Sequence, residues 1–352
     1  MTLNTTLLLF FDDQIVSNTT ANISSPPALL PIWVTSVVLP AFFGVVCVSG
    51  LIGNGLALIV FLRFSNTKKV PNVYILNLAS ADLLFMFGIP FLTYQYAAQQ
   101  WIFGELMCKI IFAIDGMNMY TGIFTLTAMS VDRYLAIVHA VWSMRHRTLN
   151  TARAICLILW LLSTVVTIPL WIYSKTIEDN GRVLCDVSWP DGNIMENLFI
   201  LYSFVVSFLL PLIIISACYI GIMTSLAKGS MGQKKRRKSK LGRVGVMVLL
   251  AVALFIVCWL PFWTVQLVML TLNEKRPSRS LAIAYYTSLC MSYANSSLNP
   301  VVYTFSRKNF RQDLTRTLFS SKPSYKITDN KRNATLYTHD KCERTIGNSN
   351  DL

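Results

Sequence analysis

The sequence predicts an all-α membrane protein, a seven-transmembrane helix bundle followed by a short amphipathic eighth helix. The chain of 352 residues is 54% hydrophobic and only 14% charged, whereas about a quarter of the residues of a soluble domain are charged. Its apolar residues form seven long runs, and a run of about 20 residues lets a helix cross the hydrocarbon core. Helices are expected because lipid leaves every backbone polar group to be satisfied within the protein.

Short polar loops separate the seven apolar runs, and none of these loops resembles a separate soluble domain. The runs cover residues 33–62, 73–97, 109–138, 154–173, 198–226, 244–272 and 281–305. They place the transmembrane domain at residues 33–305, after a polar N-terminal tail at residues 1–32. The odd number of spans predicts that the two ends of the chain lie on opposite sides of the membrane.

The segment after the last run changes character. At residues 306–319, Phe310, Leu314 and Leu318 recur every four positions among basic residues. This spacing predicts an amphipathic helix lying on the membrane surface. Residues 320–352 are rich in Ser, Thr, Lys and Asn, and this composition is typical of a disordered tail.

Lysine and arginine are concentrated in alternate loops. Of the 31 basic residues, none precedes Trp33, eight lie between Lys228 and Arg243, and ten lie from Arg307 onward. Because cytoplasmic loops carry the excess of basic residues, a plasma-membrane protein with an outer N-terminus is expected. The net charge of +14 therefore reflects topology rather than nucleic-acid binding. The outer tail holds three predicted glycosylation sequons at Asn4, Asn18 and Asn22.

Two of the eight cysteines lie on the predicted outer side. Five others fall in apolar runs, and Cys342 lies in the cytoplasmic tail. Because the outer side is oxidising, we expect a bridge between Cys108 and Cys185. The alternative is a pair of free thiols.

The third apolar run carries acids at two depths. Asp115 lies near its outer third, and the pair Asp132-Arg133 lies at its inner end. Ionisable groups inside a membrane are costly and usually functional. The apolar runs offer no lysine, arginine or histidine that would form an ion pair with Asp115. A cationic ligand group arriving from outside is therefore expected to pair with it. The alternative is a hydrogen-bonded, structural acid.

Asp82 lies deeper, in the second run. A small cation or a proton is expected there, with Asn118 and Asn299 offering the uncharged oxygens that hard cations prefer. A water-linked polar network without a specific ion is the alternative.

The apolar runs contain short motifs, one set per helix and in a fixed order along the chain. They are Gly53-Asn54, Leu78-Ala79-Ser80-Ala81-Asp82, Asp132-Arg133-Tyr134, Trp160, Cys258-Trp259-Leu260-Pro261 and Asn299-Pro300-Val301-Val302-Tyr303. The ordered set resembles that of rhodopsin-like (class A) G-protein-coupled receptors over roughly residues 33–319.

Further stretches resemble one group of this family, the somatostatin, allatostatin-C, opioid and melanin-concentrating-hormone peptide receptors. They include Trp101-Ile102-Phe103-Gly104, Asp115-Gly116-Met117-Asn118-Met119, Ser188-Trp189-Pro190 and Tyr293-Ala294-Asn295-Ser296. The Trp-Pro loop and the Asp-x-x-Asn-Met core are most similar to somatostatin and allatostatin-C receptors.

The resemblance implies roles for individual residues. Asp115 would pair with a basic residue of the peptide. Further ligand contacts would come from Gln95, Gln266, Tyr293, Trp259 and Met119. An allosteric sodium ion would lie among Asp82, Asn118, Asn295, Ser296 and Asn299. Activation and coupling would involve Asp132, Arg133, Tyr134, Tyr219, Tyr303, Ile123, Pro211 and Phe255.

The resemblance also implies partners. These are an inhibitory-class G protein that lowers cAMP, arrestin after phosphorylation of the tail, and anionic lipid at the basic cluster of residues 234–238. No cofactor is expected beyond the sodium ion. Gly122 departs from the family, which usually has a serine there, so one oxygen of the sodium pocket is missing.

Competing functions remain open. Another peptide of the group, such as melanin-concentrating hormone, an opioid or galanin, would fit the same motifs. Asp115 would also suit a small amine. A transporter would show inverted repeats or broken helices around a midplane site, and neither is visible. No nucleophile–base set or metal-ligand spacing points to an enzyme.

Overall fold

The computed structural model describes the bundle and its connections. The described residues are 30–63, 69–179, 181–190, 193–228, 231–272, 278–306 and 308–319. The predicted glycosylation sites Asn4, Asn18 and Asn22 and the tail beyond Phe319 lie outside them. Residues up to Leu314 form one compact unit and Thr315–Leu352 form a second. The bundle described below belongs to the first unit.

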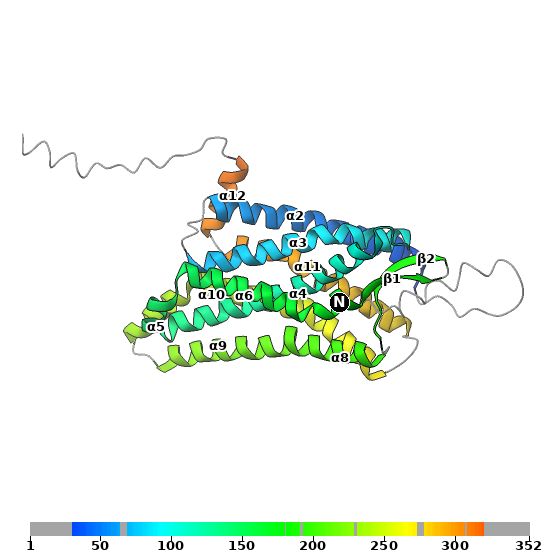
Figure 1. Cartoon of the computed structure of the whole chain (residues 1–352). Coiled ribbons are helices and arrows are strands. Elements are labelled where there is room, and N and C mark those ends of the chain that lie inside the picture. Colours follow the sequence, from blue (N-terminus) through cyan, green and yellow to red (C-terminus); the bar gives the residue numbers. More distant parts are fainter. Residues whose placement is uncertain are drawn as a thin grey trace, which may run out of the picture. The chain divides into compact units, whose positions relative to one another are not determined.

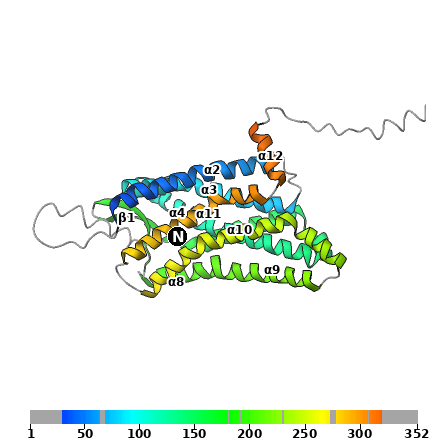
Figure 2. The same ribbon diagram turned by 180° about the vertical axis from the view of Figure 1, so that it is seen from behind.

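The bundle consists of long helices that lie side by side (Figures 1 and 2). Each predicted apolar run forms one helical segment, and some segments contain a π-helix or a break. The segments are η1 (Val34–Val38) with α2 (Leu39–Arg63), α3 (Val70–Ala98), α4 (Gly104–Ile137), α6 (Leu149–Val166) with α7 (Ile168–Tyr173), α8 (Asn193–Phe204) with η2 (Val205–Leu209) and α9 (Leu210–Lys228), α10 (Met231–Leu272), and α11 (Arg279–Ser306).

Six of these segments, all but α11, are long and apolar enough to cross a membrane among the residues that the structure describes. α11 is 28 residues long, but it buries polar residues such as Ser292 and Asn299, which lower its hydropathy. It packs against α2 and α10 and so completes the ring as the seventh helix.

Many apolar side chains face outward, and several polar side chains are buried in an interior that is otherwise mostly apolar. Phe87 and Val257 are 65% and 60% exposed on the outer surface, whereas Asp82 and Asn299 are each 2% exposed in the interior. Apolar side chains that face outward along whole helices are stable in lipid and not in water. This distribution supports the membrane-spanning prediction.

Two prolines lie near irregular points of the helices, whereas Pro90, Pro261 and Pro300 lie inside the continuous helices α3, α10 and α11. α6 ends at Val166, and α7 begins at Ile168 with Pro169 in its first turn. The π-helix η2 lies immediately before Pro211. Proline removes a backbone donor and clashes with the preceding turn, so the helix breaks or widens there.

A β-hairpin at one end of the bundle was not predicted. β1 (Ser174–Asp179) pairs antiparallel with β2 (Arg182–Val187), and Thr176 lies opposite Cys185. The predicted disulfide between Cys108 and Cys185 is present, with a Cα–Cα distance of 5.5 Å. It ties β2 to the start of α4, so the hairpin covers what we call the hairpin end of the bundle (Figure 1).

At the opposite end, the short helix α5 (Ala140–His146) connects α4 to α6 (Figure 1). α10 begins thirteen residues before the predicted apolar run, at Met231 rather than at residue 244. The predicted amphipathic helix is observed as α12 (Lys308–Phe319). Its Phe310 stacks on Phe61 of α2 with 5.2 Å between ring centroids.

Candidate ligand pocket and signalling core

Asp115 lies on α4, two turns beyond the disulfide, and is only 7% exposed. Tyr293 on α11 lies close enough to interact with its carboxylate. The ring of Tyr293 is held by Phe43 and Phe85, with centroid distances of 5.1 and 5.0 Å. Two predicted ligand residues are therefore brought together, and the carboxylate lies in a largely aromatic environment where a cation would interact strongly.

Gln95, another predicted ligand residue, has its amide occupied by the backbone of the hairpin. Its Nε2 donates to the carbonyl of Cys185 at 3.2 Å, and its Oε1 accepts from the Cys185 N–H at 2.9 Å. Gln95 is 1% exposed. It therefore holds β2 against α3 in addition to the covalent tie from α4.

A deeper part of the pocket is nearly closed. Met119 and Gln266, both predicted, line a cavity of about 10 Å³ together with Tyr120 and Trp263. This volume is at the limit for a single water molecule, which needs roughly 10–15 Å³. A ligand side chain would have to move these residues apart. Tyr120 and Trp263 were not predicted, because an aromatic residue in an apolar run carries no signal of its position around the helix.

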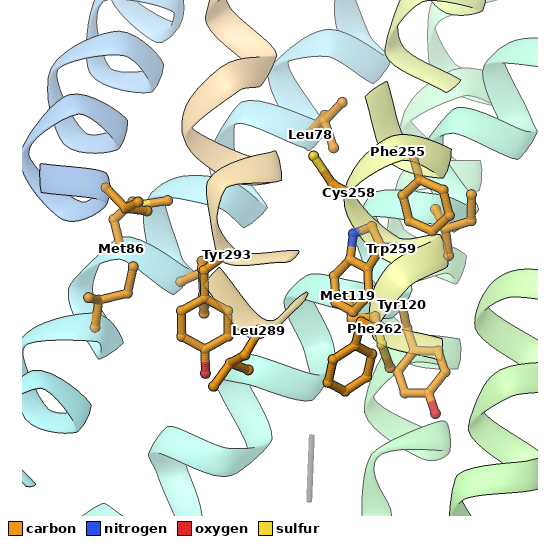
Figure 3. Close-up of a cluster of buried hydrophobic side chains, with 14 of the residues drawn as sticks. Leu78, Met86, Met119, Tyr120, Phe255, Cys258, Trp259, Phe262, Leu289 and Tyr293 are labelled. Carbon is orange, nitrogen blue, oxygen red and sulfur yellow. The ribbon is translucent and has the colours of Figure 1, made fainter. Parts of the chain in front are cut away.

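Trp259 continues this wall toward the middle of the bundle. Figure 3 shows Trp259 and Phe262 of α10 gathered with Met119 and Tyr120 of α4. Trp259 stacks on Phe255 with 5.9 Å between ring centroids, and Phe255 stacks on Phe208 with 6.1 Å. The predicted relay residues Ile123, Pro211 and Phe255 are all buried. A displacement of Trp259 would thus be passed to α10 and to the η2 region through packed rings.

A polar core lies between the two ends of the bundle. Asn299 donates to Asp82 Oδ2 at 2.8 Å, and Ser296 lies near the same carboxylate. Asn118 donates to Ser296 Oγ at 3.0 Å. The structure therefore brings four of the five predicted sodium residues together, from α3, α4 and α11.

Two amide oxygens, from Asn118 and from Asn295, the fifth predicted residue, indicate whether this polar core suits a cation. Asn118 Oδ1 and Asn295 Oδ1 are buried, and neither accepts a hydrogen bond from the described residues. Buried amide oxygens without donors are costly, and a hard cation would satisfy them. A Cβ built on Gly122 would meet only Leu78 Cδ1, at 3.9 Å. Within the described residues, no group of three or more His, Cys, Asp or Glu side chains gathers as a metal site.

The end opposite the hairpin carries a shared ion pair. Asp132 Oδ2 accepts from Arg133 Nε at 3.1 Å. Arg147, at the end of α5, donates its Nε to Asp132 Oδ1 at 2.5 Å and its Nη2 to Oδ2 at 2.9 Å. One carboxylate thus holds two guanidinium groups. Arg147 was not predicted, because nothing in the sequence shows that this loop folds back onto α4.

The other predicted coupling residues, Tyr134, Tyr219 and Tyr303, are tyrosines on α4, α9 and α11. The hydroxyl of Tyr219 donates to the carbonyl of Gly245 at 3.4 Å, which joins α9 to α10. Tyr303 is 1% exposed. Tyr134 packs so closely on Gly221 of α9 that a Cβ there would lie 2.6 Å from Tyr134 Cε2. The ends of α4, α9 and α10 that lie opposite the hairpin are therefore in contact in this conformation.

Comparison with known proteins identifies the family. The family described as 7 transmembrane receptor (rhodopsin family) matches residues 53–303. Somatostatin receptor type 3 from Homo sapiens is 39% identical over 316 residues, which are 88% of this chain and 74% of that receptor. Somatostatin receptor type 2 from Mus musculus is 39% identical over 81% of this chain and 78% of that receptor. Somatostatin receptor type 5 from Rattus norvegicus is 40% identical over 82% of this chain and 79% of that receptor.

These matches extend through all seven helices and exclude a transporter or an enzyme. The chain belongs to the rhodopsin family of seven-transmembrane receptors and is a multi-pass membrane protein.

Proposed function

We propose that the chain is a cell-surface G-protein-coupled receptor for a neuropeptide of the somatostatin or allatostatin-C type. The observation that carries the proposal is Asp115, a buried carboxylate beside Tyr293 below the hairpin end. A lysine or arginine side chain of a peptide is long enough to reach such a depth from the mouth of the bundle. The similar proteins are named as somatostatin receptors, which favours a peptide over a small amine.

The mechanism is a shift between two conformations of the bundle rather than chemistry. A ligand side chain that opens the cavity at Met119 and Gln266 displaces Trp259, and the stacked rings pass this movement along α10. The far ends of α9 and α10 then separate, and Arg133 leaves Asp132 to contact the G protein. We assign the coupling to the inhibitory class, so that agonist lowers cAMP.

A sodium ion fits the polar core and forms part of this proposal. Asp82, Asn118, Asn295, Ser296 and Asn299 would hold it, since two of their amide oxygens lack donors among the described residues. The ion would supply positive charge to a buried carboxylate. It would thereby favour the closed bundle seen here, because the oxygens come from α3, α4 and α11 together.

The remaining assignments complete the proposed topology. The N-terminal tail, with Asn4, Asn18 and Asn22 glycosylated, faces the outside, and the hairpin end lies on the same side. The tail beyond residue 319 faces the cytoplasm, where its phosphorylation recruits arrestin.

The ion pair is tested by Asp115→Asn, which keeps the size and removes the charge. Cells expressing each variant receive forskolin and a panel of cyclic somatostatin-like and allatostatin-C-like peptides, and cAMP is measured with and without pertussis toxin. Truncating one partner of a buried charge pair costs about 2–5 kcal/mol, so peptide potency should fall about 30-fold or more. Glu105→Gln is the control, since Glu105 is an exposed acid on the same helix and should leave potency unchanged.

Two results would refute parts of the proposal. Equal potency at the wild type and at Asp115→Asn would exclude the ion pair. Silence of the whole panel at a receptor confirmed on the cell surface would exclude this ligand type. Opioid, galanin and melanin-concentrating-hormone peptides and small amines would then be tested in the same assay.

A further inference from the structure

A second cavity lies at the end of the bundle opposite the hairpin. Its volume is about 270 Å³, near the lower limit of roughly 300–1,000 Å³ for small-molecule sites. Asp115 precedes Asp132, a residue of this cavity wall, by 17 positions on α4, so roughly 25 Å of helix separates the two sites. The cavity is therefore independent of the proposed peptide site.

Four elements enclose the cavity. α3 and α4 supply apolar walls through residues such as Val70, Val131 and Leu135, α6 supplies Ile155, and α5 closes one side with Trp142. Apolar cavities of roughly 150 Å³ already bind a benzene-sized guest and stay dry. A guest with an apolar body would gain burial against these apolar side chains.

One part of the wall is charged. Asp132 and Arg147 both line the cavity, and Asp132 also holds Arg133. Two guanidinium groups share one carboxylate, so the local charge is positive. Arg147 uses Nε and Nη2 for Asp132, and its Nη1 makes no hydrogen bond to any residue that the structure describes. Arginine offers five N–H donors in a fork, so an anionic group can bind at Nη1 while the pair with Asp132 stays intact.

We propose that this cavity binds a small amphiphilic carboxylate, with its apolar chain among α3, α4, α5 and α6 and its carboxylate on Arg147. The volume sets the size of the guest. At roughly 30 Å³ for a group of water size, about nine such groups fit, which matches the tail of a ten-carbon acid.

Occupation of the cavity stabilises the conformation that forms it. In this conformation Asp132 holds Arg147 and Arg133 together, and α5 lies against α4. A ligand shifts an equilibrium toward the state that it binds better. The carboxylate should therefore oppose release of Arg133 and reduce peptide-stimulated nucleotide exchange. This effect rests on the proposed receptor function, whereas the binding does not.

Binding is tested without any peptide. The full-length receptor in lipid nanodiscs is irradiated with a diazirine analogue of decanoate, and the labelled peptides are mapped by mass spectrometry. We expect labels in the segments around Val131 and Ile155, and competition by decanoate at least fivefold stronger than by 1-decanol. Labels confined to lipid-facing residues, or equal competition by the acid and the alcohol, would overturn the proposal.

A variant that fills the cavity provides a second measurement. Ala152 lines the cavity and is 1% exposed, whereas Ala154, two residues later on α6, is exposed and does not line it. Ala152→Leu should reduce the labelling at least fivefold, and Ala154→Leu should leave it unchanged. Equal labelling of both variants would overturn the site. If Ala152→Leu does not fold, the mapping and competition experiments on the wild type still decide whether the cavity binds the carboxylate.

The signalling effect is measured separately, as the rate of peptide-stimulated nucleotide exchange with and without decanoate. We expect a decrease of at least twofold that Ala152→Leu abolishes. Labelling of the cavity without a slower nucleotide exchange would refute the effect on Arg133, whereas the binding site itself would stand. A receptor that responds to no peptide, yet is labelled in the cavity, would refute the proposed function alone.

Discussion

Gly122→Ser should give the receptor a stronger sodium response. Gly122 lies one helical turn beyond Asn118 on α4, so the two positions share a face. A Cβ at this position meets nothing closer than Leu78 Cδ1 at 3.9 Å, which is ordinary van der Waals contact. Leu78 lies one turn before Asp82 on α3. A serine hydroxyl would therefore enter the polar core without displacing its neighbours.

The size of the effect follows from one added oxygen. A hydrogen bond to a charged group contributes about 1.5–3 kcal/mol, and we use this range for an additional oxygen on a bound sodium ion. Since about 1.4 kcal/mol corresponds to tenfold in affinity, the concentration of sodium that halves agonist binding should fall by about tenfold or more. In the proposed mechanism sodium favours the closed bundle, so agonist affinity at a fixed sodium concentration should fall as well.

The assay is agonist displacement on membranes over a range of sodium chloride concentrations, with N-methylglucamine chloride keeping the ionic strength constant. Gly122→Ala is the matched control, because it adds the same Cβ and no oxygen. We expect the alanine variant to follow the wild type and the serine variant to shift. If serine and alanine behave alike, the added oxygen does not reach a cation, and the sodium assignment is wrong at this position.

Two further predictions test the ends of the bundle. Arg147→Gln should raise basal G-protein activation roughly tenfold. The reason is that Asp132 loses a partly buried ion pair worth about 1–3 kcal/mol in the closed state. Unchanged basal nucleotide exchange at equal expression would contradict this prediction. Gln95→Leu should weaken peptide binding about tenfold, because two backbone groups of the buried Cys185 lose their partners at about 1–3 kcal/mol each. Gln100→Leu, an exposed position nearby, is the control, and equal peptide affinity of the two variants would show that Gln95 does not hold the hairpin.

Hydropathy predicted the helices well because lipid imposes one rule on every span. It predicted their ends poorly. α10 begins at Met231, well before the apolar run at residue 244, because apolar character marks the part inside the membrane and not the whole helix. The break between α6 and α7 falls inside the run predicted at residues 154–173. There, Pro169 was a usable signal.

The sequence contains a turn signal for the hairpin that hydropathy does not detect. Asn180-Gly181 stands between two six-residue segments, and Asn-Gly is the strongest short signal for a two-residue hairpin turn. Gly181 has a φ of +76°, a value that glycine adopts without strain. Hydropathy marks only the membrane spans, so it predicts no structure for the segment between residues 173 and 198.

The site residues that the sequence alone indicated are charged side chains at positions where apolar ones are usual. Asp82, Asp115 and Asp132 stood out because a carboxylate in an apolar run needs a reason. Gln95 lies at the end of the run at residues 73–97 and Arg147 lies between two runs. Uncharged polar side chains at a run's end and charged ones between runs are ordinary, so their partners could not be inferred. Gln95 entered through the family resemblance, but its bonds to Cys185 came only from the structure.

The placement of these carboxylates along α4 and α3 limits how a signal can cross the bundle. Asp115 lies near the hairpin end, Asp132 lies at the far end, and Asp82 lies between them in a network that reaches α11. α4 is a continuous helix between the two acids, so it cannot lengthen, and information must pass by rotation or by the helices packed around it. The shared pairing of Asp132 with Arg133 and Arg147 then makes the connection between α4 and α6 part of the switch. A variant that frees Arg147 should act on coupling even though it touches neither ligand nor polar core.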